Sequence, residues 1–378
     1  MTKPRLLILS FSPIVSDARV LKQIEVFRDR YAVTTCGYGP APAGVDRHIE
    51  MPRSASYQDL NGRLITLRMY RAAYWRISAV AWVKAHLRPG DFDVVFANET
   101  EAVPVGLWLK PRFGVHADLH EYTPRLNEEH ALWAKRIRPF HEWVCRHYVT
   151  RASSWSTVSN GLVREYEKEF GFRPELVTNA APYTDAEPTP VSTPIRLVHS
   201  GACLRNRRLT EMVDAVALSG ADVTLDLYLT PNHPDYLDEL KARVADEPAV
   251  TVHDPVPYSD LLRTLNAYDV GVHLLPPTNF NNAWALPNKL FDYVQARLGI
   301  LIGPSPEMVD YVERHGLGAV ATGFDAGDLA TTIAELDATR VTAWKANAHA
   351  SAKALGAQEQ MQKWLRLVDG LVAGGKRS

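Results

Sequence analysis

Short apolar runs alternate with amphipathic stretches along most of this sequence, and the series occurs twice. Apolar runs of strand length in the first series are 5–11, 32–38, 93–98 and 114–121, with shorter candidates at 153–159 and 175–179. Between these runs, apolar residues recur at the spacing of one helix face, as do Val20, Ile24 and Phe27 after the first run. Strand–helix–strand alternation predicts a parallel, doubly wound α/β sheet.

A segment rich in proline, threonine and alanine, 181–194, separates the two series and is expected to be a linker. The second series predicts strands at 195–201, 223–230, 250–254, 270–275, 299–303 and 318–322, then a helical stretch at about 342–372. A chain of 378 residues is long enough for two domains. We expect an N-terminal domain at 1–185, a second domain at 186–345, and a C-terminal helix at 346–378 that packs back toward the first domain. Because parallel sheets bind ligands at the carboxyl ends of their strands, two such domains facing each other across a cleft suit a reaction between two substrates.

Composition, charge and the pattern of cysteines exclude several classes of protein. Hydrophobic residues make up 46% and charged residues 22%, values typical of a soluble globular protein. The formal net charge of −1 does not favour nucleic acid as a partner. Cys36, Cys145 and Cys203 form no CxxC pair, which argues against a disulfide framework and a cysteine zinc site. The first apolar run is too short for a signal peptide and no run has membrane-spanning length, so we expect a cytoplasmic protein.

The start of the second series has features of a phosphate site. Gly201 follows the first strand, and Arg205, Arg207 and Arg208 stand at the start of the next helix. Free N–H groups at a helix N-terminus bind phosphate, and arginine adds permanently charged donors. The alternative is a basic turn exposed to solvent.

Residues 284–297, WALPNKLFDYVQAR, carry a second candidate site. Lys289 and Asp292 are three residues apart and share one helix face. The lysine can neutralise a leaving diphosphate, and the carboxylate can accept hydrogen bonds from two ribose hydroxyls. The alternative is an amphipathic helix with an ordinary Lys–Asp pair and Leu290 in the core.

Polar residues also end a strand of the first series, in HADLHEYTPR. His116, Asp118 and His120 alternate onto one face of the strand, and Glu121 points the other way. Three interpretations remain: a polar strand end, a metal site that no HExxH motif supports, or an acceptor site. In the last, His120 or a carboxylate orients the attacking hydroxyl and takes its proton.

Ser16, Asp17 and Arg19 follow the first strand. Helix capping explains Ser16 and Asp17 without any further function. The position of this loop at a strand end nevertheless places Arg19 within reach of a diphosphate or an acceptor.

The motifs together resemble a known family. LPNKLFDYVQARLGILIGPSPEM is similar to the donor-binding helix, strand and Ser/Pro-Glu loop of the retaining GT-B glycosyltransferases of the family 4-like group. HSGACLRNRRLTEMVDAV is similar to their phosphate-binding turn, and VHDPVPYSDLL resembles the stretch whose first loop contacts the base. SFSPIVSDARVLKQIEVF and DLHEYTPR also resemble members of the group, so the resemblance covers nearly the whole chain.

This resemblance implies two Rossmann-like domains of the GT-B fold facing across a cleft. It implies sugar transfer from a nucleotide diphosphate sugar, most commonly a UDP-sugar, to a hydroxyl of a glycan, a lipid-linked molecule or a small molecule. Transfer would retain the anomeric configuration and need no metal or other cofactor. Donor binding would involve Gly201, Arg205, Arg207, His253, Asn288, Lys289, Leu290 and Asp292; catalysis Asp118, His120 and Glu121; and the acceptor or diphosphate loop Ser16, Asp17 and Arg19.

Two departures from the family pattern keep other functions open. Many members carry two glutamates with seven residues between them; here Asp292 takes the later position and Trp284, which accepts no hydrogen bond, the earlier one. The candidates to replace the missing contact are Asn279, Asn281 and Asn282. The second departure is that Ala202 and Cys203 stand where an arginine is common in the family. The alternatives are an epimerase or phosphorylase of the same fold, and an inactive nucleotide-sugar-binding protein.

Residues 60–90 contain no Asp or Glu, but six Lys or Arg interleaved with Tyr70, Tyr74, Trp75 and Trp82. A second basic stretch, 135–151, includes Trp143 and Tyr148. Basic amphipathic helices with aromatic residues can lie on anionic membranes, so one interpretation is peripheral contact with the inner membrane face. The sequence favours the other interpretation, in which these helices pack on the first sheet and leave their arginines in solvent.

Overall fold

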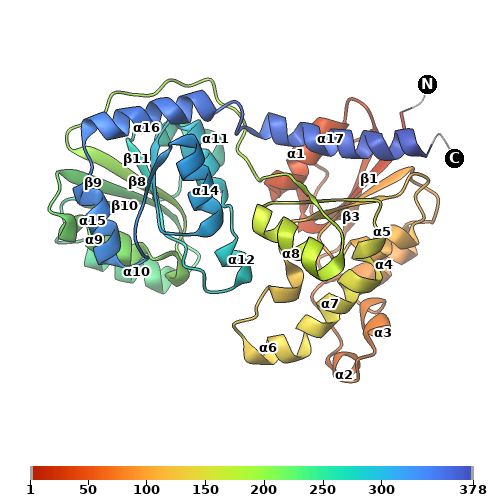
Figure 1. The fold of residues 1–378 in the computed structure, drawn as a ribbon. Helices are drawn as coiled ribbons and strands as arrows, with labels where there is room; N and C mark the ends of the chain where they lie inside the picture. The colour runs from red at the N-terminus through yellow and green to blue at the C-terminus, as the bar shows by residue number, and fades with distance from the viewer. Residues whose placement is uncertain (1–2, 376–378) are drawn as a thin grey trace. The chain divides into compact units, whose positions relative to one another are not determined.

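The computed structural model describes residues 3–375, which form two compact units. The first unit contains the described residues up to 178, together with 279–281 and the residues from 360 onward. The second unit contains 179–278 and 282–359 (Figure 1). Each unit is built on one parallel sheet, which confirms the predicted α/β class.

The sheet of the first unit has seven parallel strands in the order β3-β2-β1-β4-β5-β6-β7. The order reverses between β1 and β4, where Leu6 pairs with Val94. This reversal is the point at which doubly wound sheets offer a ligand crevice. The strands are β1 (Arg5–Pro13), β2 (Ala32–Tyr38), β3 (Arg47–Met51), β4 (Val94–Asn98), β5 (Val115–Leu119), β6 (Ser154–Thr157) and β7 (Glu175–Leu176).

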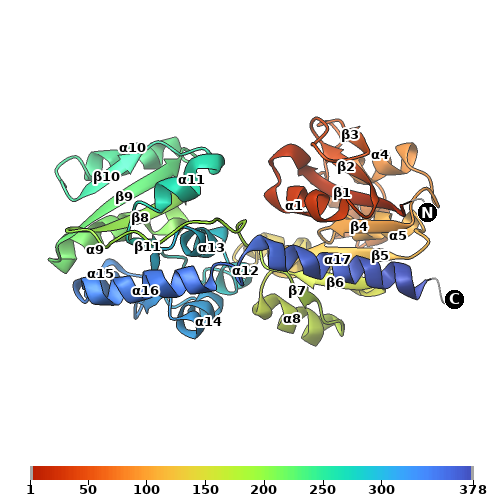
Figure 2. The same ribbon diagram turned by 90° about the horizontal axis from the view of Figure 1, so that it is seen from above.

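Helices connect these strands, and several are short. They are α1 (Ala18–Phe27), α2 (Gly62–Thr66), α3 (Tyr70–Tyr74), α4 (Ser78–His86), α5 (Val103–Trp108), α6 (Ala131–Arg136), α7 (Arg138–His147) and α8 (Asn160–Phe170), with 3-10 turns η1 (Ile14–Ser16), η2 (Thr123–Arg125) and η3 (Val149–Arg151). The last helix, α17 (Ala357–Gly374), runs along this sheet (Figure 2). Its Trp364 packs against Phe96 of β4 and donates a hydrogen bond to Ser156 of β6.

The sheet of the second unit has six parallel strands in the order β10-β9-β8-β11-β12-β13. The strands are β8 (Ile195–Ala202), β9 (Val223–Thr230), β10 (Val250–His253), β11 (Val270–His273), β12 (Gly299–Ile302) and β13 (Gly318–Val320). The helices are α9 (Leu209–Ser219), α10 (Pro234–Arg243), α11 (Tyr258–Leu265), α13 (Asn288–Gln295), α14 (Pro306–His315), α15 (Ala326–Ala334) and α16 (Ala338–Ser351), with the 3-10 turn η4 (Arg205–Arg207). The short helix α12 (Phe280–Ala283) begins in the segment 279–281 of the first unit and ends in the second unit.

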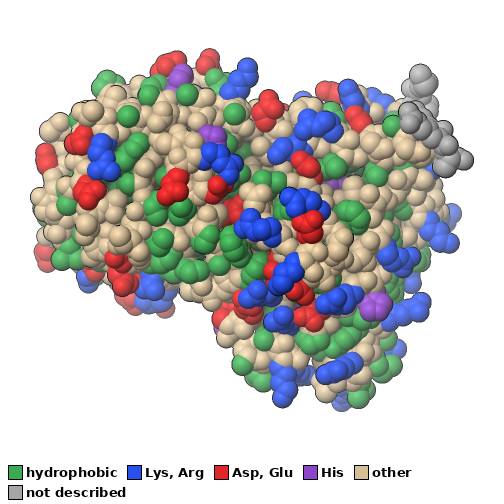
Figure 3. Space-filling view, in the orientation of Figure 1, with side chains coloured by type: hydrophobic (Ala, Val, Ile, Leu, Met, Phe, Trp, Pro, Cys, Tyr) green, Lys and Arg blue, Asp and Glu red, His purple; other side chains and the backbone are tan. Residues whose placement is uncertain are grey.

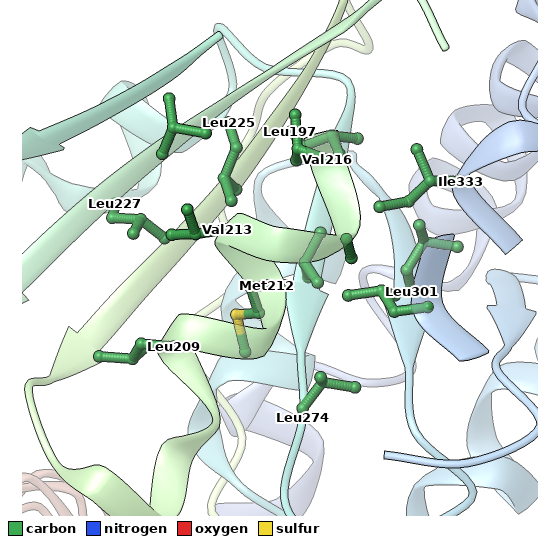
Figure 4. Close-up of a cluster of buried hydrophobic side chains, with 14 of the residues drawn as sticks. Leu197, Leu209, Met212, Val213, Val216, Leu225, Leu227, Leu274, Leu301 and Ile333 are labelled. Atoms are coloured by element: carbon green, nitrogen blue, oxygen red, sulfur yellow. The ribbon is translucent and has the colours of Figure 1, made fainter. Parts of the chain in front are cut away.

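The core of the second unit lies between α9, α15 and the central strands (Figure 4). Apolar positions of α9 recur at helical spacing, so one face of the helix is buried against β8 and β9. The buried side chains of this core include Leu209, Met212, Val213 and Val216 of α9, Leu197 of β8, Leu225 and Leu227 of β9, Leu301 of β12 and Ile333 of α15.

A buried ion pair joins α16 to the same sheet. Lys345 and Asp269 are each 1% exposed, with 3.1 Å between Nζ and Oδ1. Lys345 also donates hydrogen bonds to the carbonyl of Tyr268 and the hydroxyl of Thr189. A charge in the interior is tolerated only when it is paired and hydrogen-bonded in this way.

Two details differ from the sequence-based expectation. Strand β3 was not predicted, because Arg47–Met51 alternates only weakly between exposed and buried side chains. The helical stretch expected at about 342–372 is two helices, α16 and α17. It is interrupted where Gln295 donates a hydrogen bond of 2.6 Å to the carbonyl of Ala352.

Residues 60–90 form α2, α3 and α4, with one face packed and the other exposed. Tyr74, Ile77, Val80 and Val83 are buried in the first unit. All six Lys and Arg residues of the stretch are exposed. Within the described range, no helix combines the length and the apolar character that crossing a bilayer requires.

Candidate functional site

The carboxyl end of β8 touches the first turn of α13 at Gly201. A Cβ atom built on Gly201 would lie 2.5 Å from Nζ of Lys289, closer than non-bonded atoms approach. Only glycine therefore allows the lysine to lie across the end of this strand. The contact brings together two segments that the sequence analysis identified separately.

Lys289 is partly buried and has no neutralising partner. Its Nζ makes no hydrogen bond or ion pair with any residue between 3 and 375. Burial, and then the charge of Arg207, lower its pKa, and Asp292 opposes this only in part. A cation held from water without a partner is unfavourable, and an anionic ligand at this position would relieve the cost.

Arg207 supplies the second positive charge at this position. Its side chain is half-buried, and burial lowers the pKa of its guanidinium. It acts electrostatically on Lys289 and makes no ion pair with another described residue. Two convergent cations at a strand end, beside the N-terminus of α13, form a site suited to a diphosphate.

The neighbouring arginines have other partners. Arg205 is exposed, makes two hydrogen bonds of 2.8 and 2.6 Å to Glu239, and stacks over Tyr236. Arg208 pairs with Glu211 on α9. Of the three arginines in the basic turn, Arg207 is thus the one whose charge is directed toward Lys289.

Two histidines beneath this basic pair were not identified in the sequence. His199 of β8 and His273 of β11 are buried, with their rings stacked 5.7 Å apart. Nδ1 of His199 lies 2.8 Å from the carbonyl of Val272, so Nδ1 carries the hydrogen; its Nε2 and both nitrogens of His273 have no partner. Burial, followed by the charge of Lys289, lowers the pKa of His199 to about 3, and the same causes lower that of His273. Both rings are therefore neutral at pH 7. The sequence did not single them out, because each lies inside a run predicted as a buried strand, 195–201 or 270–275.

Other predicted donor residues lie on α13 and β10. Asp292 is 4% exposed and acts electrostatically on Lys289, and on Tyr258 at the start of α11. Leu290 is in the core, and Asn288 is exposed at the first position of the helix. His253 pairs with Asp226 and stacks on Tyr228 with ring centroids 4.6 Å apart.

The asparagines suggested as replacements for the glutamate missing at position 284 all make hydrogen bonds within the protein. Asn281 bonds to the backbone of Tyr122 through both its oxygen, at 2.8 Å, and its nitrogen, at 3.3 Å. Asn279 donates to Glu129, and Asn282 donates to Thr278. These contacts give the asparagines a structural role.

In the first unit, Asp118 is the centre of a buried network. It is fully buried at the end of β5 and accepts hydrogen bonds from Arg19 (Nε and Nη2, both 2.8 Å), Gln23 (2.9 Å), Ser156 (2.5 Å) and His120 (3.0 Å). Burial alone would raise the pKa of Asp118, but the charges of Arg19 and His120 outweigh it and hold that pKa well below its usual range. These hydrogen bonds occupy both carboxylate oxygens of Asp118.

His120 lies between two carboxylates. Its Nε2 is 3.0 Å from Asp118 and its Nδ1 is 3.0 Å from Glu99. Burial lowers its pKa, but the charges of Glu99 and Asp118 prevail and raise it to about 10. His120 is therefore an imidazolium at neutral pH, with a hydrogen on each nitrogen.

Glu99 is the residue of this cluster that the sequence analysis missed. It follows β4 directly and has a φ of 67°, in the left-handed region that non-glycine residues seldom adopt. Such a backbone conformation costs about 1–3 kcal/mol and is concentrated at functional sites. Its side chain is 32% exposed, so it can reach a ligand as well as His120.

Glu121 adds a second accessible carboxyl group. Partial removal of water, and then the charge of Glu99, raise its pKa to about 7, while His120 opposes the shift. A carboxyl group that titrates near neutral pH is suited to accepting a proton. Among residues 3–375, no three His, Cys, Asp or Glu side chains are arranged to hold a metal ion.

The loop after β1 serves mainly to start α1 and to orient Arg19. Asp17 caps the helix by accepting hydrogen bonds from the amides of Arg19 and Val20, and Ser16 bonds to the carbonyl of Pro13. Arg19 is 3% exposed and directed at Asp118, with Trp364 of α17 stacked on its guanidinium at 4.7 Å.

Comparison with known proteins identifies the fold. The chain matches no protein-family model and no curated protein sequence. Its structure is similar to that of HepE from Anabaena in complex with UDP-glucose, with 15% identity, a TM-score of 0.70, and 98% of this chain and 100% of HepE covered. Sucrose-phosphate synthase from Thermosynechococcus elongatus has 13% identity and a TM-score of 0.69, with 98% of this chain and 100% of the synthase covered. An α,α-trehalose-phosphate synthase (UDP-forming) from Burkholderia vietnamiensis has 13% identity and a TM-score of 0.67, with 99% of each chain covered. The expected GT-B fold is confirmed.

Proposed function

We propose that this protein is a glycosyltransferase that uses a nucleotide diphosphate sugar, with a UDP-sugar as the donor. The observation that carries the proposal is the pair of unneutralised cations, Lys289 and Arg207, at Gly201. The likeness of the fold to HepE, which was solved with UDP-glucose, supports the uridine donor.

In the proposed donor complex, the diphosphate lies against Lys289, Arg207 and the first turn of α13. Charge develops on the diphosphate as the bond to the sugar breaks, and two fixed cations stabilise that charge without reorganising. Asp292, one turn along α13, is the proposed acceptor of hydrogen bonds from ribose hydroxyls. His253, held by Asp226 and Tyr228, is the candidate contact on the base side.

The first unit orients the acceptor in this proposal. The acceptor hydroxyl forms the new bond to the anomeric carbon, the bond from that carbon to the diphosphate breaks, and the hydroxyl proton leaves. Because both nitrogens of His120 carry hydrogens, we assign His120 and Asp118 to positioning. Glu121, with its pKa of about 7, takes the proton.

Donor binding is tested by titrating UDP, GDP, ADP and their common sugars into the wild-type protein and the Lys289→Ala and Arg207→Ala variants. A ligand present at 100 times its dissociation constant stabilises the protein by about 2.7 kcal/mol, which a thermal scan resolves. Arg243→Ala is the matched control, because Arg243 is an exposed arginine of the same unit that pairs with Asp214. We expect one nucleotide to bind, both site variants to lose most of that binding, and the control to retain it. Absence of binding by every nucleotide would refute the proposal.

Turnover distinguishes this activity from the alternatives. Release of UDP that depends on an added acceptor indicates transfer. Interconversion of UDP-sugars without an acceptor indicates an epimerase, formation of a sugar phosphate from inorganic phosphate indicates a phosphorylase, and binding without turnover indicates an inactive binding protein.

We further propose that transfer retains the anomeric configuration and requires no metal ion, because Lys289 and Arg207 can stabilise the diphosphate charge. The anomeric proton coupling of the product, measured by NMR, reports the configuration. Activity that persists in EDTA supports the second part, and activity that is lost in EDTA and restored by Mg²⁺ contradicts it.

A further inference from the structure

Two neighbouring hollows in the first unit are lined by basic and aromatic side chains. The larger, of about 700 Å³, has Arg68, Arg71 and Arg76 on its wall together with Met69, Trp75 and Trp143. The second, of about 610 Å³, shares Arg71, Trp75 and Trp143 and adds Lys84 and Arg151. We call the area around both hollows the basic–aromatic surface. It lies outside the residues assigned to donor and acceptor.

No carboxylate lines either hollow. The Lys and Arg side chains of the 60–90 stretch are all exposed, so their charges face solvent. Lys84 lies over the rings of both Trp75 and Trp108, with its Nζ 4.9 and 5.4 Å from their centroids. All the charged side chains that line the two hollows are therefore positive, which favours an anionic partner.

Exposed aliphatic side chains border this positive area. Leu67 is 68% exposed and Met69 is 50% exposed between α2 and α3. Leu132 on α6 is 77% exposed. Arg136 of the same helix donates a hydrogen bond of 2.8 Å to Thr66, so α6 is tied to α2. Figure 3 shows Lys and Arg side chains gathered with hydrophobic ones at the end of the first unit that α2, α3 and α6 form.

We propose that the basic–aromatic surface binds the surface of a bilayer that contains anionic phospholipids. Exposed Leu67, Met69 and Leu132 gain from insertion among acyl chains, the arginines pair with lipid phosphates, and tryptophan favours the interface between the two. A nucleic acid would use the arginines and aromatic rings but offers nothing to the aliphatic side chains. The combination of arginines, aromatic rings and exposed aliphatic side chains therefore favours a lipid surface as the partner.

The number of exposed basic side chains predicts how strongly membrane binding should depend on charge. Near an anionic membrane, each Lys or Arg strengthens binding about fivefold. Replacing both Arg68 and Arg71 with alanine should therefore weaken binding about 25-fold. Salt should weaken it as well, because the screening length falls to about 3 Å at 1 M ionic strength.

The test is sedimentation of the full chain with vesicles of phosphatidylcholine alone, and with vesicles that also contain phosphatidylglycerol. We expect binding to the anionic vesicles only. The double variant Leu67→Ser, Leu132→Ser should bind at least tenfold more weakly. Leu218→Ser is the matched control, because Leu218 is 66% exposed in the second unit, and it should bind as the wild type does. All these positions are exposed, and an unchanged thermal midpoint shows that each variant is folded.

Failure to bind anionic vesicles would overturn the proposal. Equal loss of binding in the Leu218→Ser variant would also overturn it, because the basic–aromatic surface would then not be the site. A short RNA or DNA duplex that binds more tightly than the vesicles, with no effect of the leucine substitutions, would identify a nucleic-acid surface instead. Nucleotide binding by the same variants is measured in parallel, so that failure of the membrane proposal is distinguished from failure of the proposed enzymatic function.

Discussion

Replacing Lys289 with methionine should increase the stability of the free protein while it abolishes tight nucleotide binding. Methionine keeps the length and apolar stem of lysine but removes the charge. Lys289 has no hydrogen-bonding partner among the described residues. Burial and Arg207 both lower its pKa, and Asp292 opposes this only in part, so the folded protein holds this cation at a cost. Removal of such a functional but unfavourable group commonly stabilises a protein by about 0.5–2 kcal/mol.

Lys345→Met is the matched control because Lys345 is a buried lysine of the same unit that is fully paired. Its removal leaves Asp269 without its cation, which should destabilise the fold by about 3–5 kcal/mol. The backbone amides of Ser192 and Arg196 still donate to the other oxygen of Asp269, which favours the lower end of this range. The two substitutions are chemically identical and are expected to shift stability in opposite directions.

Calorimetric scans with and without UDP measure both effects. A change of 1 kcal/mol shifts the midpoint by about 2–4 °C in a domain of 150–250 residues. Lys289→Met should raise the midpoint of the free protein by a few degrees, and Lys345→Met should lower it by about 6–20 °C. Loss of a hydrogen bond to a charged group, about 1.5–3 kcal/mol, should weaken UDP binding by Lys289→Met about 10- to 150-fold. If Lys289→Met lowers the midpoint as Lys345→Met does, or binds UDP as the wild type does, the assignment of an unpaired functional cation is wrong.

Three further predictions concern single positions in the two sites. Gly201→Ala should weaken UDP binding at least tenfold, because the added Cβ would displace Nζ of Lys289. Gly327→Ala is the control, because a Cβ at that position contacts no other atom, and it should leave UDP binding unchanged. Isothermal titration calorimetry measures UDP binding by both variants. Asp118→Asn should destabilise the fold by about 3–5 kcal/mol, because its buried arginine partner loses its counter-charge, and denaturant unfolding measures this. In the wild type, the pKa of Asp118 is lower in the folded than in the unfolded protein. Its contribution to the free energy of unfolding is therefore complete above the usual pKa range of aspartate and is lost as the pH falls through the pKa of the folded state. The free energy of unfolding of Asp118→Asn should accordingly fall less steeply as the pH is lowered. Glu99→Gln should lower the pKa of His120 from about 10, because it removes the carboxylate whose charge raises that pKa most. An NMR titration of the imidazole that shows no change would refute this.

The class of fold followed from the sequence, and so did the two segments that form the proposed donor site, because both depend on local patterns. Apolar runs of strand length alternate with helical spacing, and this periodicity predicted two parallel sheets that the structure confirms. Gly201 and Lys289 each carried a local signal, a glycine after a strand and a lysine in the first turn of a helix. Those signals depend on near neighbours in the chain, which a sequence displays directly.

The partners of each side chain depended on residues far apart in the sequence, and only the tertiary structure identified them. Nothing local distinguishes Arg205 from Arg207, yet Arg205 pairs with Glu239, 34 residues away, while Arg207 acts on Lys289. Asp118 accepts hydrogen bonds from Arg19, 99 residues away, and these bonds underlie the proposed positioning role of this carboxylate. Hydrogen bonding and desolvation act at short range in space, so the protonation state and role of a residue depend on how the strands are ordered in the sheet. The sequence by itself thus determined the architecture and the chemistry available at the strand ends, and the packing of the strands determined which of those groups are free to bind a ligand.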